Sequence, residues 1–410
     1  MKKFLYVFLS VAILICSIGA LQTSAATTTS YAYSIGTLYP DGSDFTNNVR
    51  VAADIYGTIS GFRSFYQNTP TYSYLTGNNP KGVPILASEI VFLNGHASSS
   101  AIGLEYSGGS FDVTINYNSA STNKIGLRSF DMSSCKLISF VGCSTAAGTT
   151  NLPSVAVSQG AKSAIGFTDS IYSRFYNGPD WLRVFNNRIA AGYTVDAAIS
   201  SACRAYPNDS LTQYVKRYGN GSVVPAASNR STTSLRNEDN ALYHERVVSK
   251  NTYTVNNTDV KSALSSIGVD DFDVSNYCIT YNNFAEDDSN KKTMAVAIYM
   301  ISDEIETNAA YFLNYENDNL VTIGWNDYVE NIDDIDTNAI CNAVERFKAT
   351  NTYKNMGTTS FDGKAYEDTF YYDISSGNLV YRAWTSNTVI SNNGESFEEP
   401  VAVELTITLS

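Results

Sequence analysis

One cysteine and one histidine close two apolar segments in the first half of the chain. His96 ends the segment 88–96, SEIVFLNGH, and Cys143 ends the segment 136–143, KLISFVGC. A thiolate is a strong nucleophile, and an imidazole beside it can take the thiol proton or protonate a leaving amine. The two residues therefore predict nucleophilic thiol chemistry, with Cys143 as nucleophile and His96 as acid and base.

The remaining thiols and the second imidazole are weaker candidates. The sequence holds six cysteines and two histidines, with no Cys-x-x-Cys pair at metal-ligand spacing. Free cysteine is among the most often buried residue types, so packing is the alternative for Cys143 as well. We expect packing or surface roles, without chemistry, for Cys135, Cys203, Cys278, Cys341 and His244.

Short apolar segments alternate with helical patterns up to about residue 220. The predicted strands cover 30–38, 61–68, 88–96, 136–143 and 162–169, the predicted helices cover 44–59, 151–160 and 179–206, and a hairpin is expected around Gly108 and Gly109. Strands that are apolar throughout are typical of a parallel sheet covered on both faces. Reactive groups gather at the carboxyl ends of such strands, where His96 and Cys143 stand.

The pattern changes after a stretch rich in Gly, Ser and Asn at 221–242, which we interpret as a linker. Beyond it, strands and hairpins are expected at 293–302, 309–325, 368–384 and 401–409, with one helix at 336–349. This mixture predicts a smaller α+β accessory domain over 243–410. Because the pattern is complete in itself, we expect this domain to fold independently.

The first 26 residues have the features of a secretory signal peptide. Lys2 and Lys3 precede an apolar run, and small residues follow at 23–26, so the mature protein is expected to be exported. Ile15 before Cys16 argues against a lipid-modified cysteine, and no later apolar run is long enough for a membrane span. The net charge of −13 makes nucleic acid and anionic membranes poor partners.

The segments IVFLNGHA and KLISFVGCSTA, followed by NLPSVAVSQGAKSAIGF, resemble the caspase-like cysteine peptidases of clan CD. The likeness is nearest to the gingipain, clostripain and CHAT branch and covers about residues 30–205. His96 precedes Cys143 by 47 positions, similar to the roughly 50 of caspase-type enzymes. The resemblance implies a three-layer α/β/α domain with a mostly parallel sheet over 27–220. It also implies a cysteine endopeptidase that takes a polypeptide substrate and needs neither metal nor organic cofactor.

The same resemblance implies the finer parts of the site. Backbone groups at Ala97 and Gly142, with the Cys143 amide, would bind the oxyanion, although the family usually has glycine directly after the histidine. Asp169, in the loop after the next strand, would select Arg or Lys if its carboxylate is buried. The alternative for Asp169 is a turn cap.

Two other functions remain open from the sequence. The chain could be a non-catalytic extracellular binding protein that keeps this fold, or an acyltransferase that uses the same cysteine and histidine. Reactivity of Cys143 toward a peptide-based thiol label separates the enzymes from the binding protein, because a packed cysteine reacts slowly.

Overall fold

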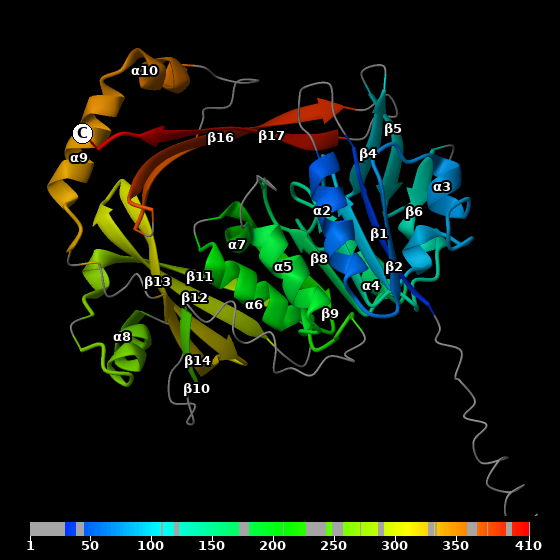
Figure 1. The fold of residues 1–410 in the computed structure, drawn as a ribbon, viewed down its shortest axis with the longest axis horizontal. Coiled ribbons are helices and arrows are strands. Elements are labelled where there is room, and N and C mark those ends of the chain that lie inside the picture. Colours follow the sequence, from blue (N-terminus) through cyan, green and yellow to red (C-terminus); the bar gives the residue numbers. More distant parts are fainter. Residues whose placement is uncertain are drawn as a thin grey trace, which may run out of the picture.

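One continuous sheet runs through both halves of the chain in the computed structural model, with fourteen strands among the described residues (Figure 1). The path is β17-β16-β15-β13-β12-β11-β9-β8-β7-β3-β1-β2, with β14 on β13 and β10 on β14. The structure describes residues 29–37, 45–107, 110–118, 123–171, 180–207, 209–226, 243–247, 257–270, 272–285, 291–326, 332, 334–358, 367–374, 376–390 and 396–409. The expected signal peptide, 1–26, lies outside them.

The N-terminal part of this sheet confirms the predicted α/β class. Its strands are β1 (Ser30–Gly36), β2 (Phe62–Gln67), β3 (Ile90–Asn94), β7 (Leu137–Val141), β8 (Ser163–Phe167) and β9 (Val215–Gly219). Neighbours from β2 to β8 are parallel, and β9 is antiparallel to β8. Every residue of β3, β7 and β8 is buried, which is why these segments are apolar throughout.

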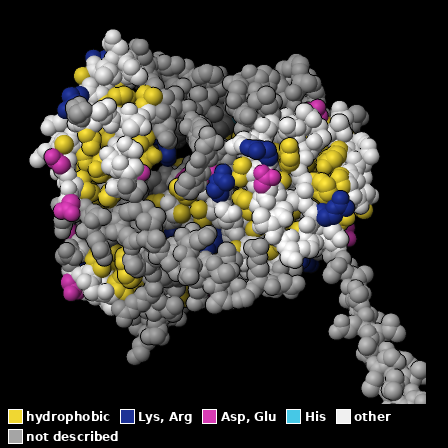
Figure 2. All heavy atoms as spheres, viewed as in Figure 1, with side chains coloured by type: hydrophobic (Ala, Val, Ile, Leu, Met, Phe, Trp, Pro, Cys, Tyr) yellow, Lys and Arg dark blue, Asp and Glu magenta, His cyan; other side chains and the backbone are white. Residues whose placement is uncertain are grey.

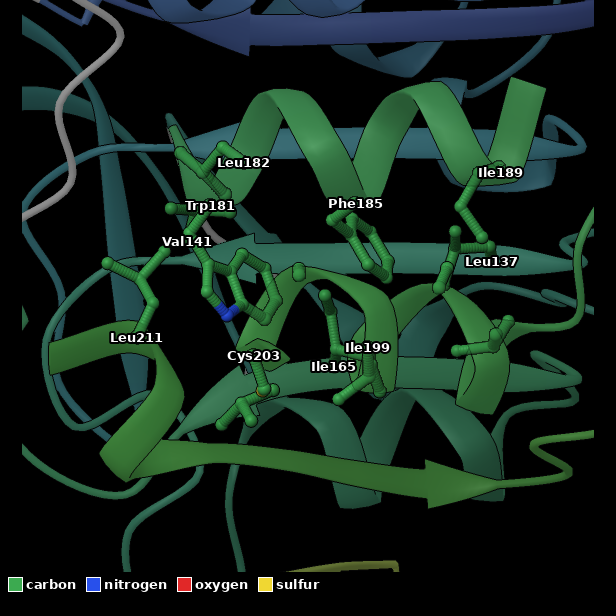
Figure 3. Close-up of a cluster of buried hydrophobic side chains, with 14 of the residues drawn as sticks. Leu137, Val141, Ile165, Trp181, Leu182, Phe185, Ile189, Ile199, Cys203 and Leu211 are labelled. Atoms are coloured by element: carbon green, nitrogen blue, oxygen red, sulfur yellow. The ribbon is translucent and has the colours of Figure 1, made fainter. Parts of the chain in front are cut away.

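Helices cover one face of these strands. They are α2 (Thr46–Gly57), α5 (Trp181–Ala190) and α6 (Val195–Ala205), with α7 (Ser210–Tyr214) beside them. Figure 3 shows side chains of α5 and α6 lying over those of β7 and β8 in one buried cluster. The predicted helical stretch 179–206 divides at Gly192, whose φ of +85° ends α5, and Thr194 then caps α6 by accepting from the Ala197 N–H.

A small sheet and another helix cover the opposite face. The sheet joins β4 (Ala101–Ser107), β5 (Ser110–Asn116) and β6 (Lys124–Gly126). The helices α4 (Leu152–Ser158) and α3 (Tyr72–Thr76) contribute side chains to the same buried cluster as these strands. β4 and β5 form the hairpin predicted around Gly108 and Gly109. Both faces of the parallel strands are therefore buried.

The second half continues the sheet with mostly antiparallel strands. They are β10 (Tyr243–Val247), β11 (Tyr277–Ala285), β12 (Lys292–Ser302), β13 (Ile305–Glu316), β14 (Asn319–Asn326), β15 (Glu367–Asp373), β16 (Asn378–Ile390) and β17 (Ser396–Ile407), with helices α8 (Asn257–Ser265), α9 (Thr337–Lys348) and α10 (Asn351–Thr358). The predicted hairpins and the helix capped by Asp336 are confirmed. In Figure 1 the β16–β17 hairpin extends across to the N-terminal half, where β17 contacts β4.

The two halves share a core, which argues against the expectation that residues 243–410 fold independently. The cluster beneath α5 and α6 also contains Phe284, Met294, Val296, Ile298 and Phe312 from β11, β12 and β13. β9 and β11 are parallel neighbours, paired at Arg217 and Ala285. Of the expected linker, 221–226 belongs to the described structure and 227–242 lies outside it.

A buried ionic group joins the halves at this same place. Arg217 is 1% exposed, and its Nε lies 2.9 Å from Asp196 Oδ1. The Nζ of Lys292 lies 3.3 Å from Asp196 Oδ2 and 2.9 Å from Glu316 Oε1. A side chain at Gly221 would lie 2.1 Å from the Asp196 carboxylate, so glycine is required there. We call Asp196, Arg217 and Lys292 the ionic triad.

None of the helices among the described residues is long and apolar enough to cross a membrane.

Candidate active site

The parallel pairing of β3 and β7 brings His96 and Cys143 to the same edge of the sheet. Asn94 is opposite Val141 in the ladder, and the Gly95 N–H donates to the Val141 carbonyl at 3.1 Å. His96 comes two residues after Asn94, and Cys143 comes two residues after Val141. Because adjacent strands are about 4.8 Å apart, the two loops begin side by side.

The loops that carry the histidine and the thiol touch at Gly142. A Cβ at this position would lie 2.5 Å from the Gly95 carbonyl oxygen and 2.6 Å from the Ala97 Cβ. Real Cβ atoms do not come that close, so any other residue would push the His96 loop away. The glycine before the cysteine in FVGC is thus explained by contact between the two loops. The structure places Ala97 and Gly142, the predicted oxyanion positions, against each other.

The backbone of Ala97 is oriented by its pairing with β4. Ala97 bridges Ile102, and the flanking hydrogen bonds run from Ser98 N–H to the Ala101 carbonyl at 2.8 Å and from Gly103 N–H to the His96 carbonyl at 2.9 Å. In this antiparallel arrangement the central residue directs its own N–H away from the partner strand. The Ala97 amide therefore points away from β4.

The Cys143 thiol is buried, as the packing alternative requires. Cys143 is 1% exposed and belongs to the core cluster beneath α5 and α6. Its Sγ–H donates to the Ile171 carbonyl at 3.6 Å, and its Sγ accepts from the Ile171 N–H at 3.4 Å. Backbone of the segment after β8 therefore lies directly on the sulfur.

His96 is also buried, at 3% exposure. Its ring meets the Phe45 ring edge to face, with centroids 5.5 Å apart and planes at 90°. Phe45 is the residue before α2, so the start of this helix fixes one side of the imidazole. Figure 2 shows no histidine side chain among the coloured residues of the face in view, in keeping with this burial.

Three residues of the site were missed by the sequence analysis. Ser144 has a left-handed φ of +56°, and its N–H donates to the Asp169 carbonyl at 3.0 Å. Thr145 is fully buried and lies in the turn 143–146, which we call the thiol turn. Its hydroxyl accepts from the Phe167 N–H and so joins this turn to β8. The side-chain N–H of Asn94 donates to the Val141 carbonyl at 2.8 Å. Only the run of small residues GCST hinted at the first two.

Asp169 does not form a buried pocket. Its side chain is exposed, and its carboxylate accepts from the Ser170 N–H at 2.7 Å, which is a local turn cap. Selection of Arg or Lys required a buried carboxylate, and Asp169 does not meet this condition. The partly buried carboxylate of this edge is Asp180, which caps α5 by accepting from the Arg183 N–H at 2.8 Å.

Burial raises the pKa of Asp180 to about 7. Between about pH 4 and 7 the folded protein therefore keeps a proton that the unfolded chain has lost, so stability falls as pH rises through this window. Asp180→Asn should remove this fall and stabilise the protein at pH 8 by on the order of 2 kcal/mol, since asparagine still caps the helix. Urea unfolding from pH 4.5 to 8 measures it, with the exposed Asp169→Asn as the control. An unchanged slope in Asp180→Asn would contradict the assignment.

Two of the other thiols are poor nucleophiles. Cys135 and Cys203 are fully buried, and burial raises the pKa of each thiol to about 12, so their predicted packing is confirmed. Cys278 and Cys341 are partly exposed, and all five described cysteines are free thiols. His244 lies in β10, with its side chain outside the described residues. The described residues hold no cluster of three or more His, Cys, Asp or Glu suited to a metal ion.

Taken together, the carboxyl edge of β3 and β7 offers a thiol, an imidazole and an amide directed away from its own ladder. These groups suit addition of sulfur to a carbonyl carbon, with proton transfer by the imidazole and hydrogen bonding to the oxygen.

Neither a family model, nor a curated protein, nor a solved structure matches the chain.

Proposed function

We propose that the protein is a secreted, caspase-like cysteine endopeptidase that uses Cys143 and His96. The observation that carries the proposal is the register of β3 and β7. Asn94 and Val141 are directly paired, and the catalytic candidates each come two residues later. Two segments 47 residues apart thereby deliver a thiol and an imidazole to one edge. The close contact at Gly142 keeps the two loops together.

The chemistry follows from these groups. Cys143 loses its proton to His96, and the thiolate forms a bond to the carbonyl carbon of the scissile peptide. The tetrahedral intermediate collapses as the carbon–nitrogen bond breaks, and His96 gives its proton to the leaving amine. Water then adds to the thioester, with His96 taking its proton, and the carboxylic acid leaves as the thiol is restored.

The oxyanion needs donors that are in place before the reaction. The Ala97 amide suits this role because its pairing with β4 directs the N–H away from that strand. Glycine at 142 lets the two loops approach so closely that backbone amides from both could donate to the same substrate oxygen. One such donor is worth about 3–4 kcal/mol of transition-state stabilisation in other enzymes.

The burial of the pair favours a second candidate, a non-catalytic extracellular binding protein. Cys143 and His96 are 1% and 3% exposed, and the Ile171 backbone lies on the sulfur. As a peptidase, the chain must displace Ile171 to admit a substrate. As a binding protein, it would keep Ile171 in place and never expose the thiol.

Labelling the intact protein with peptidyl acyloxymethyl ketones of mixed sequence separates the two candidates. In the peptidase, Cys143 should react at least about 100-fold faster than Cys135 or Cys203, because a bound peptide places its carbonyl beside an assisted thiol. Peptide mapping by mass spectrometry gives the rate at each cysteine. His96→Ala should remove most of the difference, and denatured protein, in which all thiols are equivalent, serves as the control. Labelling of Cys143 only after denaturation would leave the binding protein as the function.

A further inference from the structure

A single hydroxyl ties the thiol turn to both neighbouring strand ends. Thr145 is fully buried, and its Oγ1 lies 3.0 Å from the Phe140 carbonyl and 3.2 Å from the Gly142 carbonyl. The same oxygen accepts from the Phe167 N–H at 3.0 Å. A hydroxyl has one proton and two lone pairs, so it can donate to β7 and accept from β8 at once. Thr145 therefore connects the residue before Cys143 with the last residue of β8.

Neighbouring backbone bonds repeat this connection on both sides. The Ala146 N–H donates to the Phe167 carbonyl at 2.8 Å, and the Ser144 N–H donates to the Asp169 carbonyl at 3.0 Å. Between these bonds the chain turns through Ser144 at a φ of +56°, a backbone conformation that residues other than glycine rarely adopt. Such a turn persists only when its surroundings fix it.

β8 also leaves room for the hydroxyl. A Cβ at Gly166 would lie 2.7 Å from Thr145 Oγ1 and 3.2 Å from the Ala146 Cβ. Glycine at this position therefore lets the hydroxyl come within hydrogen-bond distance of β8. The bonds of Thr145 and the glycine opposite it are separate observations that point to the same contact.

We propose that Thr145 is a positioning residue for Cys143. It acts through the turn and not on the substrate: its hydroxyl sets where Sγ stands relative to the His96 imidazole and the Ala97 amide. The inference rests on the proposed peptidase function. A displacement of about 1 Å at a reacting atom can cost about 100-fold in rate, so a hydroxyl outside the reaction can still control it.

The test compares Thr145→Val, which keeps the shape and loses the hydroxyl, with Thr145→Ser, which keeps the hydroxyl. Peptide cleavage by the full chain is normalised to the folded fraction measured by circular dichroism, so that unfolded protein does not count. Thr145→Val should lower kcat about 100-fold with KM changed less than about 3-fold, and Thr145→Ser should stay within about 3-fold of the parent. Gly166→Ala, which pushes on the same oxygen, should also lower kcat and serves if Thr145→Val does not fold.

Thr212→Val is the matched control. Thr212 is also buried, and its hydroxyl donates to the Tyr206 carbonyl, away from the thiol turn. It should lower the melting temperature and leave normalised kcat unchanged. If Thr145→Val behaves in the same way as Thr212→Val, the positioning role is overturned while the peptidase stands.

Failure of the peptidase itself is distinguishable. If the parent cleaves no peptide, the rate of Cys143 alkylation by iodoacetamide between pH 5 and 10 becomes the readout. A changed rate or pH midpoint in Thr145→Val, restored in Thr145→Ser, supports positioning of the thiol without peptidase activity. Equal profiles in all three proteins overturn it.

Discussion

Cys143→Ala is expected to abolish peptide cleavage, with a loss on the order of 10⁴-fold or more, because no other group at this edge can form the thioester. The sulfur is buried and bonded to the Ile171 backbone, so the change also costs stability, about 1 kcal/mol. Cleavage assays with a mixed peptide library, beside urea unfolding, measure both effects.

His96→Ala should slow cleavage strongly as well, because both the proton acceptor of the thiol and the proton donor of the leaving amine are lost. The double variant should be scarcely slower than either single variant, as expected of groups that act together. Cys203→Ala is the matched control, since Cys203 is a thiol buried in the same cluster but lies on α6 and not at the ends of β3 and β7. It should lose stability and keep cleavage. If Cys143→Ala gave that same pattern, the binding-protein function would replace the peptidase.

Asp196→Ala should destabilise the whole chain by about 3–5 kcal/mol. The change leaves the guanidinium of Arg217, 1% exposed, without its carboxylate, and an uncompensated buried charge is costly. Lys292 loses one of its two carboxylates in the same step. Urea unfolding followed by tryptophan fluorescence and circular dichroism measures the loss.

The two halves should unfold in a single transition that shifts as one, because they share a core cluster and a sheet. Lys291→Ala is the control: Lys291 pairs with Asp318 at the surface, where the side chains are 45% and 57% exposed, and its loss should cost less than about 1 kcal/mol. Two separate transitions, with only one moved by Asp196→Ala, would contradict a shared core.

Local sequence patterns predicted most of the strands, the hairpins and the longer helices, because short-range physics decides them. The apolar runs around His96 and Cys143 gave the parallel strands, and the turn ENDN gave a hairpin in which Asn317 and Asp318 have φ values of 51° and 62°. The placement of His96 and Cys143 at one edge followed from the same patterns and the rule for parallel sheets.

Long-range contacts could not be predicted in this way. The residue that covers Cys143 is Ile171, 28 positions later, and nothing in either segment marks the contact. The ionic triad joins Asp196, Arg217 and Lys292, which look like ordinary solvated charges in the sequence. The polar stretch at 221–242 suggested a boundary, yet β9 before it and β11 beyond it are neighbours in one sheet.

The shared core also sets an order of events during synthesis. The apolar cluster under α5 and α6 is completed by Phe312, so when residue 226 has been made, about 90 further residues must follow before the last part of that cluster exists. At about 5–20 residues per second this takes several seconds. Until β11 has been made the sheet ends at β9, with an open strand edge, and the apolar surface stays partly uncovered until Phe312 follows. A newly made chain therefore needs protection from aggregation until its second half arrives.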